Sequence, residues 1–177
     1  MNLVLKNAYA ISDIQPSDRD AYVKHLQVKQ IHDQTLAIPY PYTLADADIW
    51  IQRVADETAR LGRSVNWAIR HPDGTVVGGI GFNELEPGVS HRAELGYWLA
   101  MPYWGQGIMT EAVKAVMAFA FDSFGLVRIT AHVFAFNKGS ARVLEKAGFQ
   151  LEGYLRKHYQ KNGVLLDGKL YASVTES

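Results

Sequence analysis

The chain has 177 residues, 48% of them hydrophobic, which is enough for one domain with a full hydrophobic core. Eighteen basic residues balance eighteen acidic ones, so no net field favours nucleic acid or an anionic membrane, and the absence of cysteine excludes disulfides, thiolate nucleophiles and cysteine-ligated metals. The sequence shows neither a signal-peptide pattern nor an apolar run of membrane length, so we expect a single cytoplasmic domain over residues 1–177.

The order of the expected elements predicts a mixed α/β domain on one twisted sheet. Strands are predicted where apolar and polar residues alternate, and helices where apolar residues recur three and four positions apart. In chain order we expect a strand, two helices, three strands, a helix, a strand, a helix and two strands. They cover residues 3–13, 18–28, 44–61, 65–70, 75–83, 92–100, 108–124, 127–134, 138–146, 149–157 and 165–174.

Boundary residues support several of these elements. Ser17, with Asp20 three positions later, and Thr43 are typical helix caps. Gly62 is a natural helix end. The pair at 162–163, Asn-Gly, is a strong hairpin signal, so the last two strands are expected to pair.

The stretch from Glu94 to Gly107 joins an apolar strand to a helix through a glycine-rich turn. Pro102 stops the strand, and Gly105 and Gly107 precede the helix over 108–124. Such a turn exposes backbone N–H groups at the positive end of the helix dipole, where phosphate binds well. A strand-to-helix connection that binds nothing has the same pattern, and these residues alone favour neither interpretation.

Four blocks of sequence are distinctive in combination. They are Ile-Pro-Tyr-Pro-Tyr-Thr at 38–43 leading to Trp50-Ile51, Ala-Glu-Leu-Gly-Tyr-Trp-Leu at 93–99, Tyr-Trp-Gly-Gln-Gly-Ile-Met-Thr-Glu-Ala at 103–112, and Asn-Lys-Gly-Ser at 137–140 running to Gly148-Phe149. In this order the chain resembles the GNAT superfamily of N-acetyltransferases, and more closely its RimJ/RimL-like branch of ribosomal-protein N-terminal acetyltransferases. The resemblance covers nearly the whole chain.

The resemblance implies a GNAT-like domain, with a mostly antiparallel sheet of about seven strands, splayed in the middle, and about four helices on its faces. It implies acetyl-CoA as donor, a primary amine as acceptor, and no metal. The pantetheine arm would lie between the strand of Leu99 and the strand that ends at Phe134. The cofactor contacts that it implies are Leu99, Met101, Trp104, Gly105, Gln106, Gly107, Ile108, Met109, Thr110, Asn137, Lys138 and Arg142.

Three residues of the turn depart from the family pattern. Trp104 and Gln106 stand where basic residues are often found, so phosphate affinity is expected to rest more on backbone amides and the helix dipole. Met109 stands where the family often has a small residue. We expect its side chain to point into the core while its N–H stays available.

Catalysis needs a neutral amine and a proton for the departing thiolate. An α-amine with a pKa near 7.7–8.0 is roughly a tenth to a fifth neutral at pH 7, whereas a lysine near 10.4 is only about 0.04% neutral, so an α-amine makes the smaller demand on a base. Glu94 is the candidate base, acting through water, with a solvated or ion-paired carboxylate as the alternative. Glu84 and Glu86 compete with it.

The usual tyrosine acid of the superfamily is replaced here by Leu144. The resemblance points instead to Ser140 as the acid that protonates the thiolate, with a helix-capping role as the alternative. Asn137 can donate to and accept from a ligand amide, or form a local turn. We include it among the catalytic candidates. His132 alternates with apolar neighbours in a strand and is interpreted as structural.

Aromatic residues of the N-terminal half are candidates for the acceptor pocket. They are Tyr40, Tyr42 and Trp50, and Glu84 is grouped with them; packing of the N-terminal helices explains the three aromatics equally well. Lys138 and Arg142 could reach the 3′-phosphate of the cofactor, or be solvated charges on a helix face.

The function predicted from the sequence is acetyl transfer from acetyl-CoA to a primary amine, most specifically the N-terminal α-amine of a ribosomal or other protein. Acetylation of a small amine, such as a polyamine, aminoglycoside or amino acid, is the same-fold alternative. A catalytically silent acyl-CoA-binding module is the alternative of a different class. No nucleic acid or membrane partner is expected, and the chain is expected to be a monomer or homodimer.

Overall fold

The computed structural model describes residues 2–83 and 85–175. These residues form five α-helices and one sheet of eight strands. The elements are β1 (Asn2–Val4), β2 (Ala10–Asp13), α1 (Arg19–Leu26), α2 (Lys29–Gln34), α3 (Leu44–Leu61), β3 (Asn66–Arg70), β4 (Val76–Asn83), β5 (Arg92–Leu99), α4 (Ile108–Phe124), β6 (Arg128–Phe134), α5 (Lys138–Ala147), β7 (Gln150–Lys161) and β8 (Val164–Val174). The predicted mixed α/β class is confirmed.

The sheet has the strand order β1-β2-β3-β4-β5-β6-β8-β7. Strand pairs are antiparallel wherever their register is defined, except that β5 and β6 run parallel. The β5–β6 register covers only the pairs from Arg92 with Arg128 to Glu94 with Thr130, although β6 continues to Phe134. The registered ladder between these two strands therefore ends at the pair of Glu94 and Thr130.

Several boundaries lie where their residues predict. The Thr43 hydroxyl accepts from the Asp46 N–H at 3.3 Å, and the Asp46 carboxylate accepts from the Thr43 N–H at 2.7 Å, which is a capping box at the start of α3. Gly62 ends α3 with a φ of 69°. Asn162 and Gly163 both have positive φ, as a two-residue hairpin turn requires.

The N-terminal segment differs from the prediction in two ways. The expected strand over 3–13 is two strands, because a 3₁₀ turn at Lys6–Ala8 folds β1 back onto β2. The expected cap Ser17 lies inside another 3₁₀ turn, and the capping box is formed by Gln15 and Asp18. Asp18 is fixed there by its ion pair with Arg70 at 2.7 Å, a contact between distant residues that local patterning does not reveal.

Two further differences concern element length. The sequence predicted no helix between residues 28 and 43, yet α2 forms there and places Ile31 in the core. β7 continues four residues past its expected end at Lys157, through a bulge between Leu155 and Tyr159. Tertiary packing decides both, since neither segment has a strong periodic signal.

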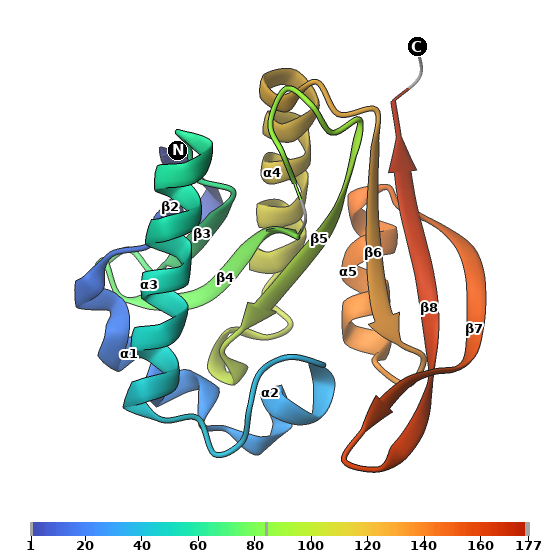
Figure 1. The fold of residues 1–177 in the computed structure, drawn as a ribbon, viewed down its shortest axis with the longest axis horizontal. Coiled ribbons are helices and arrows are strands. Elements are labelled where there is room, and N and C mark those ends of the chain that lie inside the picture. Colours follow the sequence, from blue (N-terminus) through green and yellow to red (C-terminus); the bar gives the residue numbers. More distant parts are fainter. Residues whose placement is uncertain (1, 84, 176–177) are drawn as a thin grey trace. The chain divides into compact units, whose positions relative to one another are not determined.

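The chain forms two compact units, which are described separately. The first contains the described residues up to Gly81 together with Tyr97–Ile108. Within it α1 and α3 pack together, as Figure 1 shows. A core cluster of this unit consists of Tyr22, Leu26, Ile31, Tyr42, Ala47, Ala68 and Val76.

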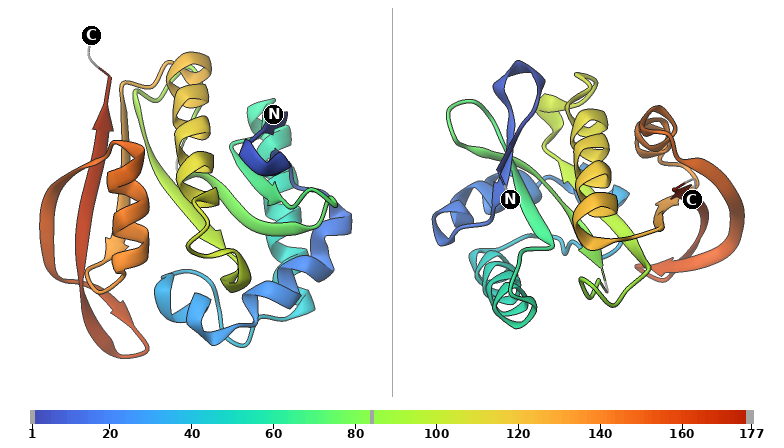
Figure 2. Two further views of the ribbon diagram at one scale, coloured as in Figure 1. Left: turned by 180° about the vertical axis from the view of Figure 1, so that it is seen from behind. Right: turned by 90° about the horizontal axis from the view of Figure 1, so that it is seen from above.

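The second unit contains Phe82–Gly96 and the described residues from Met109 onward. Its sheet is antiparallel in the order β6-β8-β7, with the start of β5 beside β6. Helices α4 and α5 lie on the same face of this part of the sheet, behind it in Figure 1 and in front of it in the reverse view of Figure 2. Within the described part of the chain, no helix is both long and apolar enough to cross a lipid bilayer.

Candidate functional site

The glycine turn before α4 is open on its outer side. Gly105 and Gly107 have φ of 75° and 82°, and a Cβ atom built on either would meet no atom within 4 Å. Side chains therefore do not cover the turn, and the positive φ values explain why glycine stands at both positions. The first N–H groups of a helix lack partners within it, so the start of α4 is suited to binding an anionic group.

Side chains within the turn hold it in place. The Trp104 indole N–H donates to the Leu99 carbonyl oxygen at 2.7 Å, and the Gln106 side-chain amide donates to the Pro102 carbonyl oxygen at 2.9 Å. Trp104 and Gln106, which stand where the family often has basic residues, thus stabilise the backbone of the turn through hydrogen bonds. The Leu99 carbonyl, expected to bind the acetyl and pantetheine groups, thus already accepts a hydrogen bond from Trp104.

An aromatic cluster fixes the segment that leads into the turn. Tyr103 packs against Tyr9 at 6.3 Å, against His71 at 6.0 Å and against His25 at 6.5 Å between ring centroids. Burial lowers the pKa of His25 below its ordinary value, which favours the neutral ring in this cluster. This support could not be predicted from the sequence, because its members come from four separate segments and no local pattern links them.

Met109 has the orientation that was expected for its side chain. Only 5% of the residue is exposed, and its neighbour Ile108 is equally buried. The bulky side chain therefore lies away from the open side of the turn. Thr110 is partly buried and Met101 is partly exposed.

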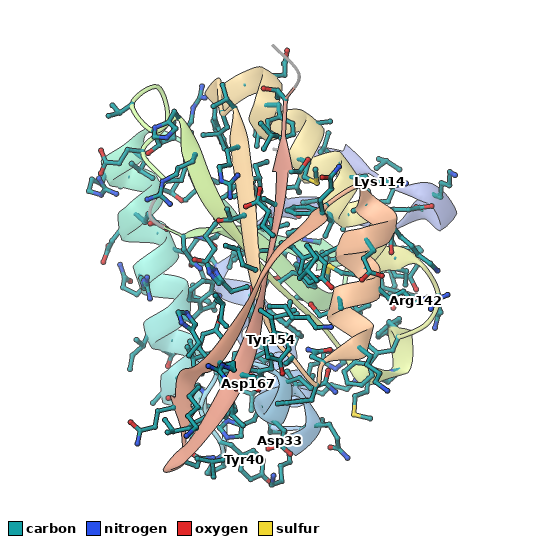
Figure 3. The ribbon with its side chains drawn as sticks, turned by 90° about the vertical axis from the view of Figure 1, so that its right-hand side faces the viewer. Asp33, Tyr40, Lys114, Arg142, Tyr154 and Asp167 are labelled. Carbon is teal, nitrogen blue, oxygen red and sulfur yellow. The ribbon has the colours of Figure 1, made fainter. Side chains whose placement is uncertain are left out.

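The start of α5 carries the candidate acid. The Asn137 side-chain oxygen accepts from the Ser140 N–H at 3.0 Å, so Asn137 is the N-cap of this helix. Ser140 lies in the first turn of the helix. Helix capping, the alternative role considered for Ser140, is performed by Asn137. Lys138 and Arg142 are exposed on the same helix; Figure 3 shows Arg142 on its outer side. Leu144 is fully buried.

The side chain of Glu94 lies close to that of His132. One of its carboxylate oxygens lies 3.3 Å from Nδ1 of His132, with 42% of the Glu94 side chain and 26% of the His132 side chain exposed. The His132 ring stacks on that of His158, with centroids 5.9 Å apart and planes 12° apart. Burial, and secondarily the charge of Glu94, raises the pKa of Tyr159 to about 12. His132 was interpreted as structural, and alternation along one strand could not reveal its neighbour on another.

A family model described as an acetyltransferase (GNAT) domain matches residues 10–150. The chain belongs to the GNAT family. The GNAT chain is 38% identical over 113 residues to the uncharacterized N-acetyltransferase YoaA of Bacillus subtilis, covering 63% of each. It is 35% identical over 102 residues to the ribosomal-protein-serine acetyltransferase of Escherichia coli, covering 58% of this chain and 56% of that one. The GNAT chain therefore spans less than two thirds of these relatives.

The fold of the GNAT chain is also that of a solved relative. RimL, a ribosomal L7/L12 α-N-protein acetyltransferase crystallised with coenzyme A, superposes with a TM-score of 0.88 over 98% of both chains at 21% sequence identity. The TM-score shows that the fold is shared, and at this identity the likeness extends no further than the fold.

The aromatic residues proposed for the acceptor lie in different environments of this GNAT fold. Tyr42 is 6% exposed within the core cluster, and burial raises its pKa to about 12. Trp50 is partly buried against the same cluster. Tyr40 is 47% exposed and lies beside the ring of His32, 5.7 Å away, so it is the most accessible of the three. Glu84 lies outside the described residues.

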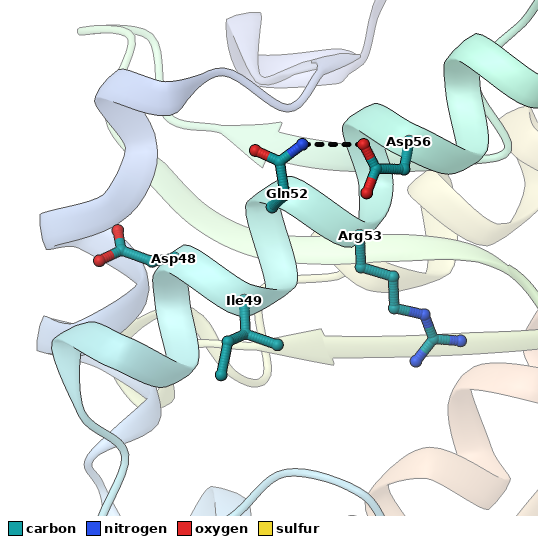
Figure 4. A pocket seen from close by; sticks show the side chains of 5 residues that line it. All are labelled: Asp48, Ile49, Gln52, Arg53 and Asp56. Atoms are coloured by element: carbon teal, nitrogen blue, oxygen red, sulfur yellow. Dashed lines mark hydrogen bonds between the residues drawn. The ribbon is translucent and has the colours of Figure 1, made fainter.

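Two surface hollows of this chain are lined by none of the residues predicted for catalysis, cofactor binding or acceptor binding. One of about 570 Å³ follows the exposed side of α3, where the Gln52 side chain donates to Asp56, as Figure 4 shows. The other, of about 470 Å³, surrounds the ion pair of Asp18 and Arg70. The first is lined by one helix alone and the second by a satisfied structural pair, so neither brings catalytic groups together.

Proposed function

We propose that this chain transfers an acetyl group from acetyl-CoA to the N-terminal α-amine of a protein or peptide. The observation that carries the proposal is the open glycine turn at the start of a 17-residue helix in a chain of the GNAT family. Acetyl-CoA supplies the thioester as acyl donor. The remaining chemistry is to bind and orient two substrates and to move protons.

Cofactor binding is proposed for two segments. Backbone amides of residues 106–110 hold the pyrophosphate, because they lie at the positive end of the α4 dipole and side chains leave the turn uncovered. The exposed Lys138 and Arg142 are charges for the 3′-phosphate. Leu99, Met101 and Asn137 contribute backbone and amide groups to the pantetheine and acetyl ends.

Proton transfer is proposed for residues of the second unit. Ser140 protonates the departing thiolate, and the capping duty it was otherwise suited to is carried by Asn137. Glu94 takes part in removing the proton of the amine. The exposed part of its side chain keeps it accessible to substrate or water.

The α-amine is proposed as acceptor for two reasons. Its ordinary pKa leaves much more of it neutral at pH 7 than a lysine amine, which lowers the demand on the base. Among the relatives, one is named a ribosomal-protein-serine acetyltransferase and a solved neighbour an α-N-protein acetyltransferase. Tyr40, the exposed aromatic, is proposed to contact the acceptor.

The test is a substrate panel with acetyl-CoA. Peptides that begin with serine, alanine or methionine are compared with the same peptides blocked at the N-terminus and carrying an internal lysine, and with polyamines, aminoglycosides and amino acids. Thiol release gives the rate and mass spectrometry gives the acetylated atom. We expect acetylation of free N-termini and none of the blocked peptides. Faster turnover of small amines, or cofactor binding without turnover of any amine, would overturn the proposal.

A further inference from the structure

We propose that Nε2 of His132 is the atom that takes the proton from the acceptor amine, and that Glu94 is a positioning residue that orients the His132 ring. This inference rests on the proposed function, since it names the base for that reaction. It changes the role of Glu94 from proton acceptor to the partner that selects one tautomer of the imidazole.

The strand register brings the two side chains together. Glu94 pairs with Thr130 in the parallel β5–β6 ladder, and His132 follows Thr130 by two residues. Side chains two positions apart lie on the same face of a sheet, so Glu94 and His132 share a face just beyond the last pair of the ladder. No further β5–β6 pair is registered after this point, which leaves room for the ring and the carboxylate to meet.

The contact selects the tautomer. A carboxylate oxygen 3.3 Å from Nδ1 favours a proton on that nitrogen, because a carboxylate can only accept. In a neutral imidazole the other nitrogen, Nε2, is then an unprotonated acceptor. The distance is slightly long for a hydrogen bond, as catalytic hydrogen bonds often are without substrate.

Residues of β7 complete the surroundings of His132. His158 stacks on the ring, and Tyr159 lies next to His158 with centroids 4.7 Å apart. The cross-strand neighbour on β8 is Leu170, which carries no charge. Among the described residues, the titratable side chains in contact with His132 are thus those of Glu94 and His158, and Tyr159 lies beside His158.

A bulge in β7 precedes Tyr159 and helps to position His158 and Tyr159 near His132. Asp167 of β8 accepts from the Lys157 N–H at 2.7 Å and from the Tyr154 hydroxyl at 2.8 Å, which fixes the bulge; Figure 3 shows Tyr154 and Asp167 together. A Cβ at Gly168 would come within 2.6 Å of the Tyr159 ring. Glycine at this position thus lets the tyrosine lie across β8.

As free groups, imidazoles match the proton affinity of an α-amine more closely than carboxylates do. A free imidazole has a pKa of about 6.5 and a free glutamate about 4.3, against about 7.7–8.0 for an α-ammonium. Proton transfer from the amine is therefore about 10²-fold less unfavourable to an imidazole than to a carboxylate. In the step itself one N–H bond of the ammonium breaks and an Nε2–H bond forms. The amine keeps the electron pair with which it attacks the acyl carbon, and the imidazolium returns its proton to solvent.

The decisive comparison is between His132→Asn and Glu94→Gln. Asparagine keeps an N–H close to the place of Nδ1 but has no basic nitrogen, and glutamine keeps an oxygen that accepts from Nδ1. We expect His132→Asn to lower kcat with an α-amine peptide by about 10²-fold and Glu94→Gln by less than about 10-fold. His91→Asn, an exposed histidine ahead of β5, is the matched control. A larger loss from Glu94→Gln than from His132→Asn, or no loss from either, would overturn the assignment.

Two further readouts separate this role from a structural one. The pH profile of kcat/KM should lose its imidazole-dependent acidic limb in His132→Asn, and imidazole added to His132→Ala should restore part of the rate. The ¹⁵N chemical shifts of the His132 ring report the tautomer without any turnover. We expect protonated Nδ1 in the wild type and a mixture in Glu94→Ala, whereas a proton on Nε2 would contradict the inference even if no amine proved to be a substrate. Circular dichroism confirms that each variant is folded.

Discussion

The Trp104 indole N–H donates to the Leu99 carbonyl oxygen at 2.7 Å, and this bond connects the glycine turn to the end of β5. A side chain in the turn thus fixes the backbone whose amides are proposed to hold pyrophosphate. Trp104→Phe keeps most of the apolar ring and removes the donor. We expect the Kd for coenzyme A to rise by about 3- to 10-fold, which is the usual contribution of one hydrogen bond. Isothermal titration calorimetry measures it, with Tyr154→Phe, which removes a hydrogen bond from the β7–β8 hairpin, as control.

The positive φ of Gly107 gives a second prediction. Alanine at a φ of 82° is strained by roughly 1–2 kcal/mol, so Gly107→Ala should distort the turn and weaken coenzyme A binding by about tenfold or more. Gly88 has a φ of 81° and equally open space around it, so Gly88→Ala imposes the same strain elsewhere. Equal losses of affinity in the two variants would mean that the turn has no special role.

Ser140→Ala tests the proposed acid. We expect turnover to fall by about 10²-fold or more, the low end for general acid catalysis, with little change in the Kd for coenzyme A. Ser123→Ala, at the exposed end of α4, is the control. Unchanged turnover in Ser140→Ala would remove this serine from the mechanism.

Breaking the ion pair between Asp18 and Arg70 should cost more stability than breaking the exposed pair between Arg19 and Asp48. The Asp18 side chain is 6% exposed and that of Arg70 15%, and Asp18→Ala leaves the guanidinium largely buried without its carboxylate. We expect a loss of about 3 kcal/mol in the free energy of unfolding, measured with urea. Asp48→Ala breaks the exposed pair with Arg19 and should cost less than about 1 kcal/mol. Similar losses for the two variants would contradict the ranking.

The lowered pKa of Asp73 gives a prediction for how the stability of the fold changes at acidic pH. Hydrogen bonds from Thr75 lower its pKa to about 2, so the folded state binds its proton less readily than the unfolded chain. Its contribution to stability is then present above about pH 4 and disappears as the pH falls through about 2. Asp73→Asn should flatten the decline of the thermal midpoint between pH 4 and 2, and an unchanged slope would argue against the role.

Local sequence signals predicted the elements whose ends are set by nearby residues. Thr43 and Gly62 delimit α3 through contacts made within a few residues, and the Asn-Gly pair at 162–163 needs only its own backbone conformation. Ser17 was wrongly predicted as the cap before α1, where Gln15 and Asp18 form the capping box and Asp18 is held by Arg70, 52 residues away. Local patterning fails where a distant side chain decides the boundary.

In the candidate site, too, features set by nearby residues were predicted and those set by distant residues were not. The open turn at Gly105 and Gly107 follows from glycine placement alone, and Met109 is buried, as was expected if the turn needs its amide and not its side chain. The contact of Glu94 with His132 depends on the register of two strands that are separated by a helix. A single sequence cannot fix that register, so this contact could not be predicted from it.

The most direct test of the central claim is a coenzyme A titration followed through the backbone amide signals of residues 105–110. We predict that these signals shift on addition of coenzyme A and do not shift with pantetheine, which lacks the diphosphate. Binding of coenzyme A that leaves these amides unperturbed would contradict the account.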